Sequence, residues 1–245
     1  MTSEGPAHRI ALVTRSQTVH RVGYRPAVWR WTPWRYATNG RFNGRWDDPD
    51  GIWRTLYVGD SRLACYLELI ACMRPDPILT AAFDDLDDTD AEDDTLTYPT
   101  ASAGLVPLSW CDSRLVGTAT LHGPFVQIGD ISTIASLRIR FRAPAMSMGL
   151  ADLDAAALRD ARPRALTQAI SAYLYRQRTP DDDIPVTGIE FSSRHADNCR
   201  LWAVYERPGD PETSPHLDPH LADESVDPTD LLLSQAISLL GLTWA

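Results

Sequence analysis

The sequence predicts an α+β fold, a single domain in which mixed or antiparallel sheets are flanked by helices. Short apolar runs separated by glycine and proline are typical of strands. Two longer segments, residues 163–178 and 228–240, are predicted to be helices. At 245 residues, the chain is long enough for one well-buried domain and short for two.

The composition is typical of a globular protein, with 44% hydrophobic and 23% charged residues. No stretch approaches the roughly 20 apolar residues that cross a bilayer, and the N-terminus lacks a charged region followed by an apolar one. We therefore expect a cytoplasmic protein with no membrane partner. The four cysteines show no Cys-x-x-Cys pairing, so we expect reduced core residues. They are Cys65, Cys72, Cys111 and Cys199.

All 23 basic residues are arginine. The absence of lysine excludes a P-loop lysine, the Schiff-base lysine of pyridoxal phosphate enzymes and a lysine general base. The net charge of -10 disfavours a large nucleic-acid footprint. A small anionic substrate can still bind where arginines are focused, because guanidinium groups pair with phosphate in a bidentate manner.

Residues 1–17 are predicted to be a loosely held arm, and residues 18–245 the folded domain, beginning with a strand over residues 18–22. The next segment, residues 24–36, interleaves three tryptophans with arginines. Such a segment can stack on a nucleotide or simply pack, and both alternatives stay open.

Residues 40–72 organise the chain: a loop rich in arginine, glycine and asparagine leads into a strand and then a helix. Ser61, or alternatively Asp60, is the expected N-cap of that helix. Glu68 lies on its apolar stripe, where an ionised carboxylate is costly without a partner. Alternatively, Glu68 turns to the helix edge and meets solvent. The stripe consists of Leu63, Ala64, Leu67 and Ala71, and the arginines that could offset Glu68 are Arg41, Arg45 and Arg54.

The middle of the chain begins with an acidic run, residues 84–94, which is typical of a solvated loop or an interaction surface. Strands are then predicted over residues 106–108, 115–119 and 125–128. Residues 131–141 form either a helix or a strand.

The C-terminal part contains the predicted helix 163–178 and then two strands, residues 186–191 and 200–205, around a Ser-Ser-Arg-His turn. Residues 207–227 are expected to be irregular before the last helix. Prolines precede both histidines of the His216-x-x-x-His220 pair, which makes a helical metal site implausible, and no metal site is predicted.

Two blocks of this sequence resemble the RES-domain family, bacterial toxins that destroy NAD. The first runs from Gly44-Arg45-Trp46-Asp47 through Leu56-Tyr57-Val58-Gly59 to Glu68, and the second is Gly188-Ile189-Glu190-Phe191-Ser192-Ser193-Arg194-His195. Because the blocks occur in the family's order and far apart, they are more specific together than alone. The resemblance covers residues 19–243 and implies a fold similar to ADP-ribosyltransferases.

The resemblance implies an active-site set composed of Arg45, Tyr57, Glu68 and Ser193. Arg41 is the alternative arginine, because the loop between Arg45 and Tyr57 is about two residues longer than in the common family pattern. NAD is expected to be held by Arg45, Tyr57, Arg41 and Arg194. The family's usual asparagine after Arg-Trp is Asp47 here.

The implied reaction is cleavage of the nicotinamide N-glycosidic bond of NAD, with water or inorganic phosphate as acceptor and no cofactor beyond NAD as the substrate. The resemblance also implies an Xre-type antitoxin as protein partner. Two alternatives remain: a mono-ADP-ribosyltransferase acting on protein or RNA, and a non-enzymatic binding module.

Overall fold

The computed structural model describes residues 9–75, 103–160 and 162–245. Its strands are β1 (Leu12–Tyr24), β2 (Thr55–Gly59), β3 (Leu105–Val106), β4 (Arg114–Gln127), β5 (Gly188–Ser192), β6 (Arg200–Tyr205), β7 (Leu217–Pro219), β8 (Glu224–Ser225) and β9 (Thr243–Trp244). Its α-helices are α1 (Arg62–Ile70), α4 (Ser109–Asp112), α5 (Ile131–Ser147), α6 (Ala155–Asp160), α7 (Arg164–Tyr175) and α8 (Leu231–Leu239). Two 3₁₀ turns, η1 (Trp34–Tyr36) and η2 (Ala71–Met73), complete the set.

The main sheet has the strand order β1-β2-β6-β5-β4-β7, with β8 beside β4. Strand β1 also pairs with β4 from Leu12 to Tyr24, so β1, β2, β6, β5 and β4 close into a five-stranded barrel. The β4–β5 pairing is parallel and the other pairings in this sheet are antiparallel. The fold is therefore α+β with a mixed sheet and flanking helices, as predicted.

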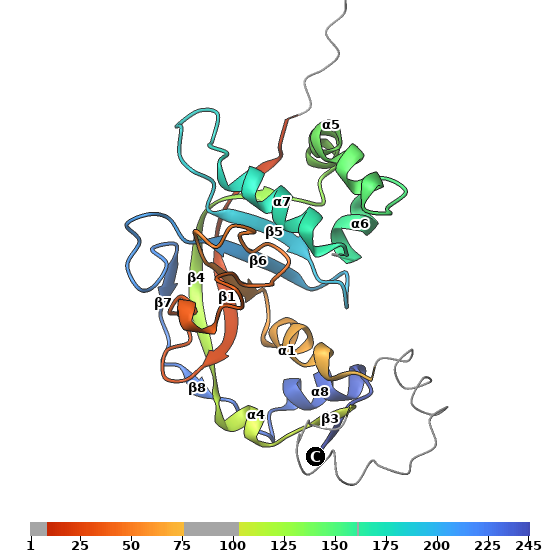
Figure 1. Ribbon diagram of the computed structural model, residues 1–245. Coiled ribbons are helices and arrows are strands. Elements are labelled where there is room, and N and C mark those ends of the chain that lie inside the picture. Colours follow the sequence, from red (N-terminus) through yellow and green to blue (C-terminus); the bar gives the residue numbers. More distant parts are fainter. Residues whose placement is uncertain (1–8, 76–102, 161) are drawn as a thin grey trace, which may run out of the picture.

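The helices form two groups on opposite sides of the β5–β6 hairpin. Helices α5, α6 and α7 lie together on one side, while α1 and α8 pack against each other on the other (Figure 1). The turn between β5 and β6 thus lies between the two groups. This arrangement brings α1, early in the chain, beside residues that follow β5.

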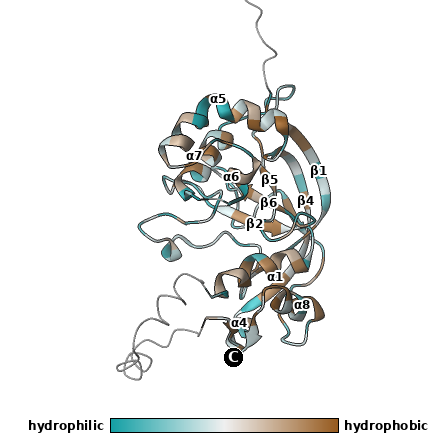
Figure 2. Cartoon of the chain, turned by 90° about the vertical axis from the view of Figure 1, so that its right-hand side faces the viewer, coloured by the Kyte–Doolittle hydropathy of each residue, from teal (hydrophilic) through white to brown (hydrophobic). Residues whose placement is uncertain are grey.

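Alternation along the strands gives the sheet two apolar faces. In β2, Leu56 and Val58 join one buried cluster with Trp202 of β6, while Tyr57 packs against a second and larger cluster. The larger cluster lies between the sheet and the helices, and Figure 2 shows the apolar residues of α1, α8 and the central strands. A residue's position in the strand therefore decides whether it faces the helices.

Side-chain caps begin several helices where the sequence offers an N-cap residue. Ser61 Oγ accepts a hydrogen bond from the Ala64 amide of α1 at 3.2 Å, which confirms the predicted cap. Asp130 and Asp230 cap α5 and α8 in the same way. Residues 131–141, left open between helix and strand, belong to α5.

Several predicted boundaries are wrong. The arm predicted over residues 1–17 is too long, because residues 12–17 form the first half of β1, where they pair with β4. The two strands predicted over 115–119 and 125–128 are one strand, which continues through Gly123 at φ 120°. A Cβ at Gly123 would lie 2.2 Å from Thr187 Oγ1, so the close approach requires glycine.

Other predictions differ by smaller amounts. Strand β3 has two residues and ends at Val106, before Pro107, so the predicted strand 106–108 is wrong, while β6 has the predicted bounds. The segment 207–227 contains the short strands β7 and β8. Cys72 is exposed, contrary to prediction, whereas the other three cysteines are buried and all four are free. The acidic run 84–94 lies outside the described residues.

The aromatic segment 24–36 packs against the fold. Trp29 and Trp31 are buried, and their indole N–H groups donate to Asp223 Oδ1 and the Pro211 carbonyl. Trp34 stacks on Phe42, with 5.4 Å between ring centroids. Packing and hydrogen bonding therefore account for these tryptophans.

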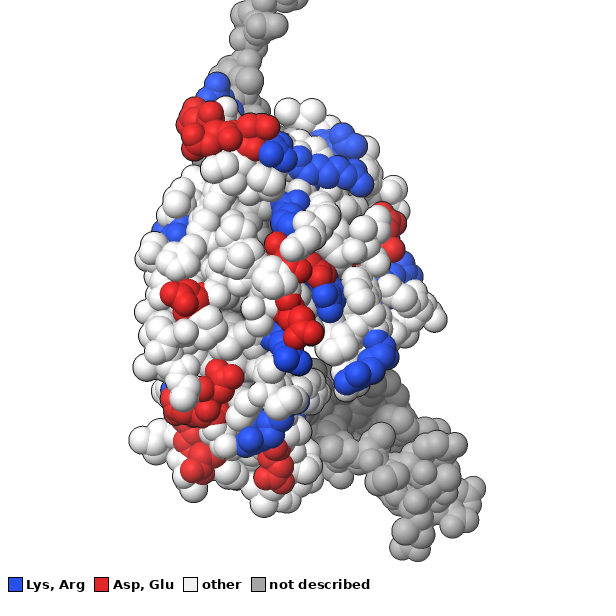
Figure 3. Space-filling model, turned by 90° about the vertical axis from the view of Figure 1, so that its left-hand side faces the viewer, with Lys and Arg blue, Asp and Glu red and all other residues white. Residues whose placement is uncertain are grey.

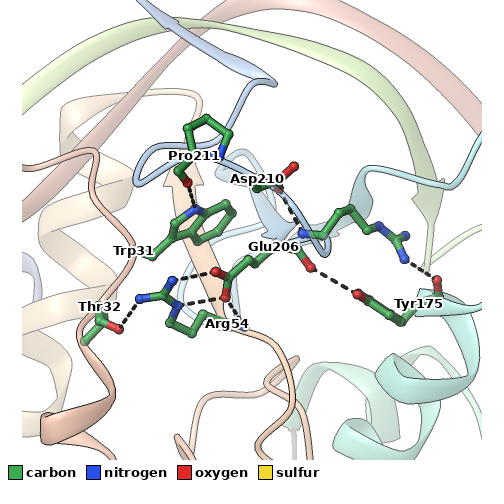
Figure 4. A network of polar contacts seen from close by, with 8 residues as sticks. Trp31, Thr32, Arg54, Tyr175, Glu206, Asp210 and Pro211 are labelled. Atoms are coloured by element: carbon green, nitrogen blue, oxygen red, sulfur yellow. Dashed lines mark hydrogen bonds and ion pairs between the residues drawn. The ribbon is translucent and has the colours of Figure 1, made fainter.

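An ion pair joins the start of β2 to the end of β6. Arg54 binds both carboxylate oxygens of Glu206, and Tyr175 of α7 donates from its hydroxyl to the Glu206 carbonyl at 3.2 Å (Figure 4). Elsewhere, the face in Figure 3 carries arginine and acidic side chains interspersed. Within the described ranges, no helix is long and apolar enough to cross a membrane.

Candidate active site

Glu68 and Ser193 meet between α1 and the β5–β6 turn. The Ser193 hydroxyl donates to Glu68 Oε1 at 2.6 Å, and Ser193 Oγ accepts from the His195 amide at 2.9 Å. Ser193 is 1% exposed, while Glu68 is half-buried. The serine is therefore fixed as a donor toward the carboxylate, and Glu68 Oε2 has no hydrogen-bond partner among the residues described.

Arg45 is the arginine of this region best suited to bind an anion. Its residue is 8% exposed, its guanidinium lies 5.2 Å from the Phe191 ring centroid, and no described residue forms a hydrogen bond or ion pair with it. Burial lowers the pKa of Arg45, and the nearby charge of Glu68 partly offsets this. The two groups thus interact electrostatically without forming a salt bridge.

The backbone around Arg45 is held on both sides. Gln168 and Ser171 of α7 donate to the carbonyls of Gly44 and Trp46 at 3.1 and 2.6 Å. A Cβ at Gly44 would lie 2.6 Å from the Tyr57 hydroxyl, so only glycine fits there. Because both flanking carbonyls are fixed, Arg45 is presented on a rigid loop.

The hydroxyl of Tyr57 is engaged within the protein. It accepts from the Trp46 amide at 2.9 Å and donates to Asp47 Oδ1 at 2.9 Å. Burial, followed by the charge of Asp47, raises the pKa of Tyr57 well above its ordinary value. Burial also raises the pKa of Asp47, against the hydrogen bonds from the Gly44 amide and from Tyr57. Tyr57 therefore positions the Arg45 loop, and its hydroxyl is occupied within the protein.

Further arginines lie near Arg45 and His195. Arg164 at the start of α7 and Arg194 beside Ser193 both act electrostatically on Arg45. His195 has its pKa lowered mainly by burial, with Glu68 raising it and with Arg194, Arg74 and Arg45 lowering it. The site is thus one carboxylate within a cluster of arginines, which favours an anionic ligand.

The other two upstream arginines do not reach Glu68. Arg41 is exposed and donates to the Pro49 carbonyl at 3.4 Å, and Arg54 is paired with Glu206. Of the predicted set, the structure brings together Arg45, Glu68 and Ser193, with Tyr57 behind the Arg45 loop and Arg194 at the rim. The alternative Arg41 lies outside this group.

Two contributors were not identified from the sequence. Asp47, noted only as a departure from the family asparagine, fixes Tyr57. The sequence indicated nothing about Arg164 beyond its place in the first turn of a predicted helix. Its proximity to Arg45 arises from packing between distant segments.

One hollow beside these residues lies next to the Glu68–Ser193 pair and not over it. This cavity of about 350 Å³ is lined by Arg45 and Phe191 but by neither Glu68 nor Ser193. A second hollow of about 390 Å³ includes Arg194 and shares Ala155 and Arg159 with the first. No known family model, curated protein or solved structure matches this chain.

Proposed function

We propose that this protein cleaves the nicotinamide N-glycosidic bond of NAD and transfers the ADP-ribosyl group to water or inorganic phosphate. The observation that carries the proposal is the half-buried Glu68, fixed by Ser193, beside the buried Arg45, which forms no ion pair with any residue that the structure describes. A fold similar to ADP-ribosyltransferases and a place among the RES-domain toxins belong to the same proposal. Their support is the resemblance of the two sequence blocks that supply these residues.

Bond cleavage needs stabilisation of a positively charged ribosyl centre. The C1′–N bond breaks with both electrons going to the pyridinium nitrogen, which leaves as neutral nicotinamide, and the ribosyl carbon gains oxocarbenium character. A fixed carboxylate stabilises this charge as it develops. Glu68 Oε2 is the free oxygen for this role, while Ser193 holds the other oxygen in place.

The acceptor completes the reaction at the same carbon. An oxygen of water or phosphate forms a bond to C1′, and with water the proton lost passes to Glu68 or to solvent. Arg45 supplies the charge that neutralises the dinucleotide pyrophosphate. The surrounding arginines equally suit a phosphate acceptor, so both acceptors are retained.

The test is NAD consumption by the purified protein, followed by chromatography with and without phosphate. Glu68→Gln keeps the shape and the Ser193 contact but removes the charge, and we expect a rate loss of about 100-fold or more. Glu212→Gln is the matched control, because that carboxylate is 75% exposed and pairs only with Arg30 at the surface. Intact NAD after long incubation with the wild-type protein, freed of any bound partner, would overturn the proposal.

The proposed partner is an Xre-type antitoxin that covers this site, and the proposed consequence in cells is loss of NAD. Induction of the wild-type chain should lower cellular NAD and arrest growth, whereas Glu68→Gln should do neither. Growth arrest by both variants would point to a non-enzymatic binding activity instead.

A further inference from the structure

The cavity beside Phe191 is a compartment distinct from the Glu68–Ser193 pair. It has a volume of about 350 Å³ and lies between β5, the β4–α5 turn and α6. Ligand sites usually measure roughly 300–1,000 Å³, so this cavity suits about half of a dinucleotide. Its lining includes Arg45, Ile128, Leu158, Arg159, Phe191 and Arg200.

Arg45 gives this cavity an unpaired buried cation. The residue is 8% exposed, lines the cavity and has no ion-pair partner in the described part of the chain. An isolated buried charge is unfavourable, and an anion bound in the cavity would relieve that penalty. Arg45 therefore points to a ligand with negative charge.

Two further arginines line the cavity with their guanidinium groups only partly engaged. Arg159 pairs with Asp197 through one nitrogen at 2.6 Å, and Arg200 lies 3.6 Å from Glu190. Their side chains are 44% and 53% exposed, so each can turn toward a bound anion. A planar guanidinium fork matches a phosphate in a bidentate manner.

The carboxylates that line the cavity have other partners and do not pair with Arg45, and Glu190 also forms the 3.6 Å ion pair with Arg200. Glu190 accepts from Arg15 at 2.6 and 2.8 Å, from Gln127 at 3.2 Å and from the Trp202 indole at 3.0 Å. Asp130 caps α5 through Ser132. The guanidinium of Arg45 is consequently left for an external anion.

Part of the cavity wall is apolar. Ile128, Leu158 and the aromatic ring of Phe191 line it together with the arginines. Phe191 has the Arg45 guanidinium near its ring, so an aromatic surface and a cation adjoin. A flat base stacks on such surfaces, and a phosphate meets the cations.

We propose that this cavity binds the nucleoside monophosphate half of a dinucleotide, the adenylate part of NAD that the reaction leaves intact. This inference rests on the proposed function and adds the second compartment of its substrate. Arg45 stands at the boundary and holds the phosphates, Arg159 and Arg200 support them, and the base lies against Phe191, Ile128 and Leu158. The nicotinamide ribose then extends to Glu68.

The test is equilibrium binding of AMP to the full-length protein by calorimetry. AMP lacks the scissile bond, so its binding does not require catalysis. Arg159→Gln and Arg200→Gln should each weaken AMP about tenfold or more, since a charge-assisted hydrogen bond is lost. Arg178→Gln is the matched control, because that arginine pairs with Asp183 at the surface and does not line the cavity.

Adenosine and inorganic phosphate distinguish the possible sources of binding. Each should bind at least about tenfold more weakly than AMP if base and phosphate are both recognised. Phosphate that binds as tightly as AMP would make the cavity an acceptor-anion site and overturn the inference. AMP binding unaffected by both arginine changes would also overturn it, even if NAD is cleaved. Arginine-dependent AMP binding without NAD cleavage would uphold the inference and reject the proposed function.

Discussion

Replacing Tyr57 with phenylalanine tests whether its hydroxyl or its ring matters. The change removes two hydrogen bonds, one from the Trp46 amide and one to Asp47, but keeps the ring, whose centroid lies 6.5 Å from that of Phe191. A neutral hydrogen bond contributes about 1 kcal/mol and one to a carboxylate about 1.5–3 kcal/mol. We expect the free energy of unfolding to fall by roughly 2–4 kcal/mol.

The loss should depend on pH through Asp47. Its pKa in the folded protein is raised, so the folded state is favoured below the ordinary value of 3.8 and loses that contribution as the pH rises through the folded pKa. Removing the Tyr57 hydroxyl raises the pKa of Asp47 further. The difference between variant and wild type should therefore be larger at pH 7 than at pH 4.

Urea unfolding followed by tryptophan fluorescence at both pH values measures this difference. Tyr173→Phe is the control, since its hydroxyl forms no hydrogen bond within the described ranges, and it should change stability by less than about 0.5 kcal/mol. If Tyr57→Phe costs no more than the control, the hydroxyl does not anchor the Arg45 loop and the reasoning fails.

Three further predictions concern other contacts. Ser61→Ala removes the N-cap of α1 and should lower the free energy of unfolding by about 1 kcal/mol in a urea titration. Arg15→Met leaves the buried Glu190 with two neutral donors and the longer contact to Arg200, and should cost about 2–4 kcal/mol at pH 7. Burial raises the pKa of Glu190, but its hydrogen bonds with Arg15 and others outweigh this and lower it, so the Arg15 contribution should be present above the ordinary pKa of 4.5 and be lost as the pH falls through the folded value. Finally, NAD cleavage should decline as the pH falls below 6.5 through the lowered pKa of His195, because a protonated imidazole would offset the field of Glu68. His195→Asn should remove that acidic decline in the rate profile.

Each of these has an outcome that contradicts it. Ser61→Ala should be compared with Ser234→Ala at an exposed position, and equal stability of the two would exclude a capping role. For Arg15→Met, a loss that stays constant from pH 7 to pH 3 would show that Glu190 is not its partner. An unchanged acidic limb in His195→Asn would assign that titration to another group.

The local elements were determined largely by the sequence itself. Ser61 marks the start of α1 because its hydroxyl accepts a hydrogen bond from the Ala64 amide, an interaction within one helical turn. The bounds of β6 follow from a run of apolar and aromatic residues that needs no distant information. The grouping of Arg45, Glu68 and Ser193 was reached through resemblance, since nothing in local spacing joins residues this far apart in the chain.

The tertiary structure determined the features that depend on strand pairing and on packing between distant segments. Residues 12–17 look like a polar arm, yet they form a strand because β4 runs alongside them. Arg45 differs from Arg41 because α7 holds the carbonyls on both sides of Arg45, whereas Arg41 is exposed. The engagement of the Tyr57 hydroxyl with Asp47 and the cavity behind Phe191 likewise arise from contacts between distant segments. Loop closure and burial determine such contacts, and a linear pattern of residues does not encode them locally.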